Sequence, residues 1–146
     1  MPMLRPWLEE GFRRAGGAKG FADFEIQPRV EVAITDDIKG ALARQKPRAA
    51  LYVGGMGHRD KNFHKEMMIH RGFGDAAQRI QELFLARRKD EAVAAVPDEF
   101  CDEMALVGPP ARIRERYRAW ADCGITGLTI TTEQPEAMEL MAGLAR

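Results

Sequence analysis

Two strand-like segments lie far apart in this chain, and their spacing limits the folds available to it. Residues 24–35 alternate between apolar and polar side chains, which predicts a strand, with Pro28 marking an end, an edge or a bulge. Residues 125–132 are rich in β-branched side chains and predict a short buried strand. A closed eight-stranded barrel takes around 250 residues, whereas this chain has 146. We therefore expect a helix-rich α/β fold with too few strands to close a barrel.

Helical patterns fill most of the remaining sequence. Apolar side chains recur at helical spacing, and capping residues, glycines or prolines mark the ends. Pro47 forces a kink or a fresh helix start before the apolar residues 49–53. The apolar residues 104–108 predict neither a helix nor a strand. The expected helices cover residues 3–15, from Thr35 or Asp36 through Leu42, 62–70, from Asp75 through Phe84, 90–97, from Pro109-Pro110 to Gly124, and from Pro135 through Leu144.

Composition favours one folded domain and excludes several classes of partner. Lys plus Arg and Asp plus Glu each number 22, so there is no basic excess to favour nucleic acid. No apolar run approaches the length of a membrane span, and the N-terminus lacks the apolar core of a secretory signal. We expect a cytoplasmic protein with no membrane or nucleic-acid partner. Cys101 and Cys123 are expected to be reduced thiols without a function.

The segment LYVGGMGHRDKNFH, residues 51–64, is the strongest candidate for a ligand site. It matches neither a P-loop nor a dinucleotide-binding motif, because the required spacing of glycines, Lys and Ser or Thr is absent. Two interpretations remain open. The glycines could end a helix and form a turn before a helix that starts near Asp60. Alternatively, main-chain N–H groups, with Arg59 and Lys61 beside them, could contact an anion.

Other chemistry-bearing residues have simpler structural explanations. The spacing of six residues between His58, His64 and His70 puts them on different sides of a helix, so we expect no metal site. Gly108-Pro109-Pro110 is interpreted as a structural helix start. The remaining candidates are expected to be a solvated helix surface, at Arg112, Arg114, Arg116 and Arg118, and core side chains, at Met138 and Met141.

Five segments, in order along the chain, resemble the bacterial luciferase-like monooxygenase superfamily, and most closely its oxidoreductases that use the deazaflavin coenzyme F420. They are PMLRPWLEEGFRRAGG, FEIQPRVEVAITDDIKGAL, LYVGGMGHRDKNFH, AAQRIQELFLARRKDEAVAAVPDEF and LVGPPARIRERYRAWADCGITGLTI. The resemblance implies a partial (β/α)8 TIM barrel: residues 1–146 would form a single domain from its C-terminal part. Residues 24–35 would be the seventh strand, residues 125–132 the eighth, and residues 37–105 a helical insertion over the barrel mouth.

The same resemblance implies hydride transfer between coenzyme F420, or alternatively FMN, and a small organic substrate, with the catalytic residues unknown. The implied cofactor-binding residues are Gly54, Gly55, Gly57 and Arg59, and the implied substrate-pocket residues are Phe63 and His64. A separate N-terminal barrel half or a second copy is the expected partner, and a non-catalytic interaction module is the alternative function. Glu25, Arg29 and Glu31 depart from the pattern, since a barrel strand buried on both faces should be almost continuously apolar.

Overall fold

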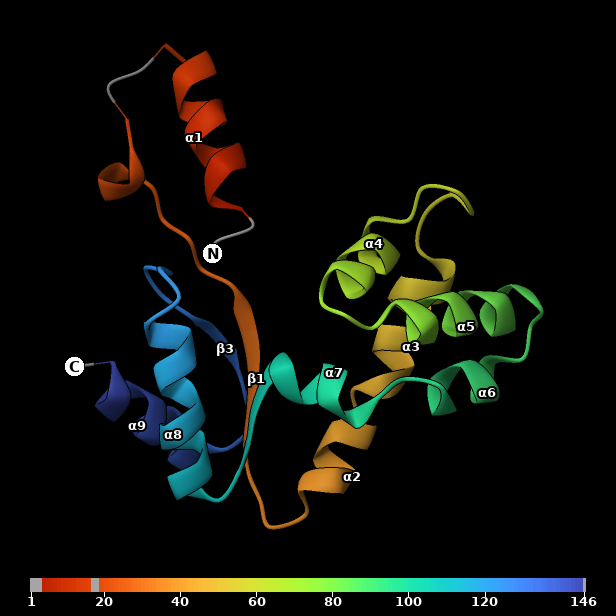
Figure 1. Cartoon of the computed structure of the whole chain (residues 1–146). Coiled ribbons are helices and arrows are strands. Elements are labelled where there is room, and N and C mark those ends of the chain that lie inside the picture. The colour runs from red at the N-terminus through yellow and green to blue at the C-terminus, as the bar shows by residue number, and fades with distance from the viewer. Residues whose placement is uncertain (1–3, 17–18, 146) are drawn as a thin grey trace. The chain divides into compact units, whose positions relative to one another are not determined.

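The computed structural model describes residues 4–16 and 19–145. The chain forms two compact units, shown with their elements in Figure 1. The terminal unit combines the described residues of 1–34 and 109–146, and the middle unit comprises residues 35–108. Among the described residues, no helix combines the length and the apolar character needed to cross a membrane.

In its described residues, the terminal unit contains two parallel strands and three α-helices. Its elements are α1 (Arg5–Arg14), η1 (Phe21–Asp23), β1 (Arg29–Ile34), α8 (Pro110–Ala121), β3 (Thr129–Thr131) and α9 (Pro135–Leu144). Strands β1 and β3 pair in register, with Val30 opposite Ile130, and α9 packs against both β1 and α8. Its buried apolar side chains are Val30, Val32, Ile113, Ala137 and Met141.

Strand β1 is shorter than the sequence predicted. The expected strand started at residue 24, but β1 begins only at Arg29, directly after Pro28. Proline has no N–H to donate to a neighbouring strand, so the regular ladder starts beyond it. Within β1 the alternation is as expected: Val30 and Val32 are buried, and Arg29 is exposed and donates from Nε to Thr131 Oγ1 at 2.8 Å.

A glutamine side chain continues the β1–β3 contact beyond the end of β3. Gln134 accepts a hydrogen bond from Ile34 N at 2.7 Å and donates one to Ile34 O at 3.0 Å. Its amide thus occupies the place of a further strand residue, satisfying both main-chain groups of Ile34. This contact fixes the start of α9, which Gln134 immediately precedes, against the end of β1.

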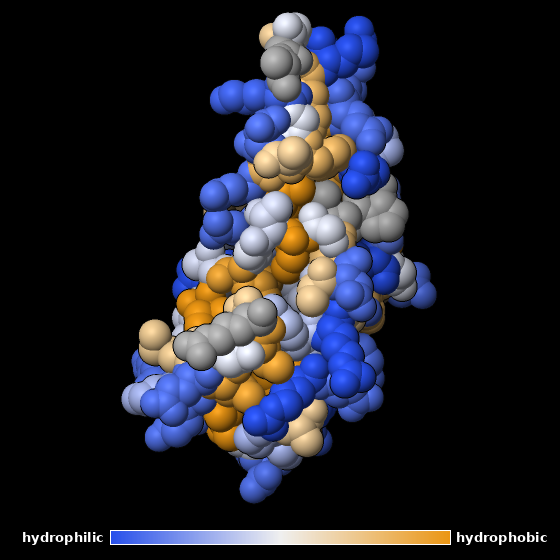
Figure 2. Space-filling view, turned by 90° about the vertical axis from the view of Figure 1, so that its left-hand side faces the viewer, coloured by the Kyte–Doolittle hydropathy of each residue, from blue (hydrophilic) through white to orange (hydrophobic). Residues whose placement is uncertain are grey.

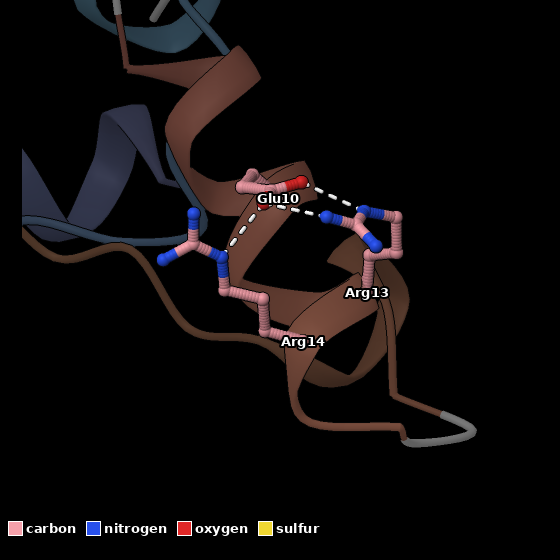
Figure 3. Close-up of polar contacts among 3 residues, drawn as sticks. All are labelled: Glu10, Arg13 and Arg14. Atoms are coloured by element: carbon pink, nitrogen blue, oxygen red, sulfur yellow. Dashed lines mark hydrogen bonds and ion pairs between the residues drawn. The ribbon is translucent and has the colours of Figure 1, made fainter.

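Helix α1 lies on the surface of the terminal unit. It covers Arg5–Arg14 within the expected range 3–15, of which Met3 lies outside the described residues, and Pro6 stands in its first turn. None of its described residues is buried. Glu10 accepts hydrogen bonds from Arg13 and Arg14 on this exposed surface (Figure 3).

The middle unit is a helical cluster that ends in a short strand. Its elements are α2 (Ile38–Ala43), α3 (Lys46–Gly55), α4 (Phe63–His70), α5 (Gly74–Leu85), α6 (Lys89–Ala94), α7 (Asp98–Glu103) and β2 (Ala105–Gly108). Helix α3 packs against α4, α5 and α6, and β2 packs against α2 and α7. Most of the buried apolar side chains among the described residues belong to this unit, including Met68, Ile80 and Leu106.

The middle unit differs from the sequence analysis at three places. The cap of α2 is Asp37, whose Oδ1 accepts from Gly40 N at 2.9 Å, rather than Thr35 or Asp36. The short helix predicted over residues 90–97 is α6, which ends before Pro97 as expected, but Pro97 is also the N-cap of a further helix, α7, that was not predicted. Residues 105–108, given no element, form strand β2, and all four are buried. A buried run this short has no period that separates strand from helix.

Candidate functional site

The first two glycines of the 51–64 segment lie in the last turn of α3. A Cβ at Gly54 would stand 2.4 Å from Phe84 Cβ, and one at Gly55 would stand 2.3 Å from Phe84 Cε1. Phe84 belongs to α5, so the missing side chains let the two helices approach closely. Both glycines therefore have a packing role inside the middle unit.

Residues 56–61, called here the basic loop, connect α3 to α4. Gly57 has a φ of +115°, which other residues rarely adopt, and a Cβ there would stand 3.1 Å from Lys61 O. Lys61 N donates to His58 O at 3.1 Å, which closes the turn. The turn interpretation is thus confirmed for the backbone, but the next helix begins at Phe63 rather than near Asp60, because Asn62 is its cap.

The charged side chains of the basic loop are exposed. Arg59 and Lys61 provide two cations, with Asp60 between them. His58 Nδ1 accepts a hydrogen bond from Asp60 N at 3.2 Å, which ties the histidine to its own turn. Guanidinium and ammonium groups bind phosphate and carboxylate groups through charge-assisted hydrogen bonds. The chemistry available at this loop is therefore anion binding.

Two buried polar side chains anchor the basic loop, one directly after it and one from α5. Asn62 is 3% exposed; its Oδ1 accepts from Lys65 N, and its Nδ2 donates to Val53 O at 2.8 Å and Tyr52 O at 3.2 Å. Gln81, from α5, is 6% exposed and donates to Arg59 O at 3.0 Å. The sequence analysis missed both. Asn62 carried a local signal, since Asn is a favoured helix cap, whereas nothing near Gln81 in the sequence pointed to the loop.

The predicted substrate-pocket residues belong to an aromatic cluster on α3 and α4. The His64 ring lies edge-on to Tyr52, with centroids 4.6 Å apart, and Phe63 lies 4.9 Å from His64. Phe63 is 65% exposed. The guanidinium of Arg48 lies over the Tyr52 ring at 5.5 Å. The structure thus brings Phe63 and His64 together and adds Tyr52 and Arg48, which the sequence analysis did not name.

The remaining candidates are dispersed. Within residues 4–16 and 19–145 there is no cluster of three or more side chains suited to metal ligation. Cys101 is buried in the middle unit, where burial raises the pKa of its thiol to about 11. Cys123, half-buried, donates from Sγ to Trp120 O at 3.0 Å. Pro109 is the cap of α8, in agreement with the structural interpretation of the 108–110 segment.

Comparison with known proteins places this arrangement in a family. The model of the luciferase-like monooxygenase family matches residues 3–127. A protein of Mycobacterium tuberculosis, named "Putative coenzyme F420-dependent oxidoreductase", is 37% identical over 142 residues, which is 97% of this chain. This chain spans 41% of the length of that curated relative. The matched residues include the whole middle unit, with the glycines of α3 and the basic loop. The chain therefore belongs to the luciferase-like monooxygenase family.

Proposed function

We propose that this chain supplies part of the coenzyme F420 site of a luciferase-like oxidoreductase that transfers hydride between the deazaflavin and an organic substrate. The observation that carries the proposal is the 37% identity to the mycobacterial protein over 97% of this chain. A bound deazaflavin supplies the hydride chemistry, and the protein binds it, orients it and excludes water. Other contacts to the coenzyme would come from a further barrel segment, since active sites of such barrels draw on many strands.

The basic loop fits the anionic part of such a coenzyme. Arg59 is exposed, and its planar guanidinium can contact a phosphate group through two hydrogen bonds. Gly57 adds main chain without a covering side chain. Gly54 and Gly55 belong to the proposed site as the end of α3 from which the loop departs. Arg59 is therefore the residue of this chain expected to contribute most to coenzyme affinity.

The aromatic cluster fits the organic part of the reaction. Phe63 presents a largely exposed ring beside His64. An aromatic ring face of this kind stacks on a planar group, contributing about 0.5–1.5 kcal/mol beyond the area that it buries. We assign Phe63 and His64 to the substrate side of the site on this ground.

Calorimetric titration of oxidised and reduced coenzyme F420 into the purified chain tests the proposal. We expect binding that weakens about tenfold in Arg59→Ala, because a hydrogen bond to a charged group contributes about 1.5–3 kcal/mol. Arg79→Ala is the matched control, since it removes an exposed arginine from α5 and leaves the loop intact. Absence of heat at high micromolar coenzyme would refute binding by this chain alone.

FMN is titrated under the same conditions as the alternative cofactor. Tighter binding of FMN than of coenzyme F420, with the same dependence on Arg59, would replace the deazaflavin in the proposal. If Arg59→Ala changed the affinity for neither ligand, the basic loop would not be part of the cofactor site.

A partner for the terminal unit is also proposed, on the basis of its exposed apolar side chains. Trp7 is 64% exposed, and Met138, which the sequence analysis expected in the core, is 56% exposed. Leu4 and Phe24 are also exposed. Figure 2 shows hydrophobic residues open to solvent on the side of the molecule where α8 and α9 lie. Exposed apolar groups of this kind favour association. The N-terminal barrel half is the partner that the family fold would supply, and a second copy is the alternative.

A further inference from the structure

The basic loop is held from beneath by a side chain of another helix. Gln81 lies on the buried face of α5, between Ile80 and Leu83 in sequence, where an apolar side chain would bury without any need for hydrogen bonds. Its Nε2 donates to Arg59 O at 3.0 Å, 22 residues away in the sequence. A buried amide at this place is thus satisfied by the main chain of the residue that carries the proposed anion contact.

Lys65 fixes the orientation of the Gln81 amide. The Lys65 ammonium donates to Gln81 Oε1 at 2.7 Å. An ammonium only donates and a main-chain carbonyl only accepts, so each end of the amide has a partner of the matching kind. If the amide were turned over, its NH2 group would face the Lys65 ammonium, donor against donor, and its oxygen would face Arg59 O, acceptor against acceptor. The donor end of Gln81 is therefore held towards Arg59.

We propose that Gln81 is a positioning residue for the basic loop, holding the Arg59 main chain so that the Arg59 side chain stays directed to solvent for an anionic group of the ligand. The identity of the ligand rests on the proposed function, whereas the holding of the loop rests on the hydrogen bonds of Gln81. Asn62, directly after the loop, donates to Tyr52 O and Val53 O of α3 and so ties the start of α4 to α3. Because Arg59 O is held from α5 and the residue that follows the loop is held to α3, a ligand has less conformational entropy to remove from the loop.

Hydrogen exchange of the full chain tests the loop geometry without any ligand. Gln81→Glu keeps the acceptor for Lys65 and the size of the side chain, but removes the donor to Arg59 O. We expect the Asp60 and Lys61 amides, which donate to His58 Nδ1 and His58 O, to exchange about fivefold faster, as expected for one lost hydrogen bond. Gln78→Glu is the control, because Gln78 also accepts from Lys65 but is exposed and lies outside the loop contact.

The exchange data give two opposing outcomes. Faster exchange confined to the loop in Gln81→Glu, and absent in Gln78→Glu, supports the positioning role. Unchanged loop exchange overturns it, as does equal acceleration throughout α3 and α5, which would make Gln81 a contributor to general stability only. Neither result depends on whether coenzyme F420 binds, so failure of the proposed function is recognised separately in the titration above.

A double-mutant cycle tests the connection to the ligand. Coenzyme F420 is titrated into the parent chain, Gln81→Glu, Arg59→Ala and the double variant. If Gln81 acts through Arg59, we expect Gln81→Glu to weaken binding about fivefold in the parent and to have no further effect once Arg59 is alanine. Equal weakening in both backgrounds would overturn the link to Arg59, because a general loss of stability would act with or without the guanidinium.

Discussion

At the scale of single residues, glycine is required by packing at one helix position and not at another. Gly54 is buried in α3, where Phe84 occupies the space that a side chain would need. Gly11 lies in α1, and a Cβ there would meet nothing within 4 Å. Glycine in an open helix position only raises the entropy of the unfolded chain. A comparison of the two sites therefore separates the cost of contact from the cost of flexibility.

Replacing each glycine by alanine should change stability in opposite directions. Gly54→Ala is expected to destabilise the chain by about 1–3 kcal/mol, because overpacking forces side chains and backbone to shift. Gly11→Ala is expected to stabilise it by about 0.5–1 kcal/mol through better helix propensity. Urea unfolding monitored by circular dichroism measures both. If Gly54→Ala were as stable as the parent, the close approach of α3 and α5 would be wrong.

The two cysteine thiols should differ in reactivity. Burial raises the pKa of the Cys101 thiol to about 11, so little reactive thiolate forms at pH 8. We expect a thiol reagent to modify Cys123 in the native chain and Cys101 only after unfolding, as measured by mass spectrometry. The Cys101→Ser and Cys123→Ser variants identify each reaction. Rapid native labelling in Cys123→Ser would contradict the burial of Cys101.

The raised pKa also sets the direction of a pH effect. The folded state holds the Cys101 proton more tightly than the unfolded state does, whose thiol has a pKa near its ordinary value of 9.0. The contribution of the Cys101 thiol to the free energy of unfolding is therefore fully present below about pH 9 and is lost as the pH rises towards 11. A Cys101→Ala variant should lack this part of the alkaline loss.

At the scale of elements, α1 shows how a helix is stabilised on an exposed surface. Its first turn contains Pro6, which suits the start of a helix. Glu10 pairs with Arg13 three residues on and with Arg14 four residues on, the two spacings that meet on a helix. Phe12 packs edge-on against Phe21 and Phe24. The side-chain contacts described for α1 are thus mostly with residues close to it in the sequence.

Titration of Glu10 measures this local contribution. Hydrogen bonds from Arg13, and then from Arg14, hold the pKa of Glu10 below its ordinary value. The ion pairs are thus present at neutral pH and are lost as the pH falls through the lowered pKa. We expect Arg13→Gln to raise the pKa of Glu10, followed by NMR of the carboxyl carbon. High salt should move it the same way by screening, and a pKa unaffected by either change would contradict the pairing.

At the scale of the whole molecule, the proposed partner surface of the terminal unit gives a further prediction. Trp7→Glu with Met138→Glu should lower the fluorescence of a hydrophobic dye bound to the chain and reduce self-association measured by light scattering. Leu51→Glu is the control, since Leu51 is an exposed apolar residue of the middle unit. A parent chain that is monomeric and binds no dye would argue against a partner at this surface.

Helices and their ends were the part of the fold most open to prediction. The ends of α8 and α9 depend on residues within a few positions of one another, and their predicted limits agree closely with the structure. Strand β2 was missed because a short buried run has no distinguishing period. Pro28 was recognised as a boundary or bulge, but its effect in delaying β1 required the position of the neighbouring strand.

Sequence by itself determined the family, through the order of its segments, and the helices, through caps and periodicity that act within a few residues. Tertiary structure decided what the candidate residues do. Gly54 serves packing because Phe84 lies against it, and Gln81 holds Arg59 from 22 residues away. Such contacts join distant parts of the chain, and their geometry exists only once the helices have packed, so no local pattern of residues could contain it.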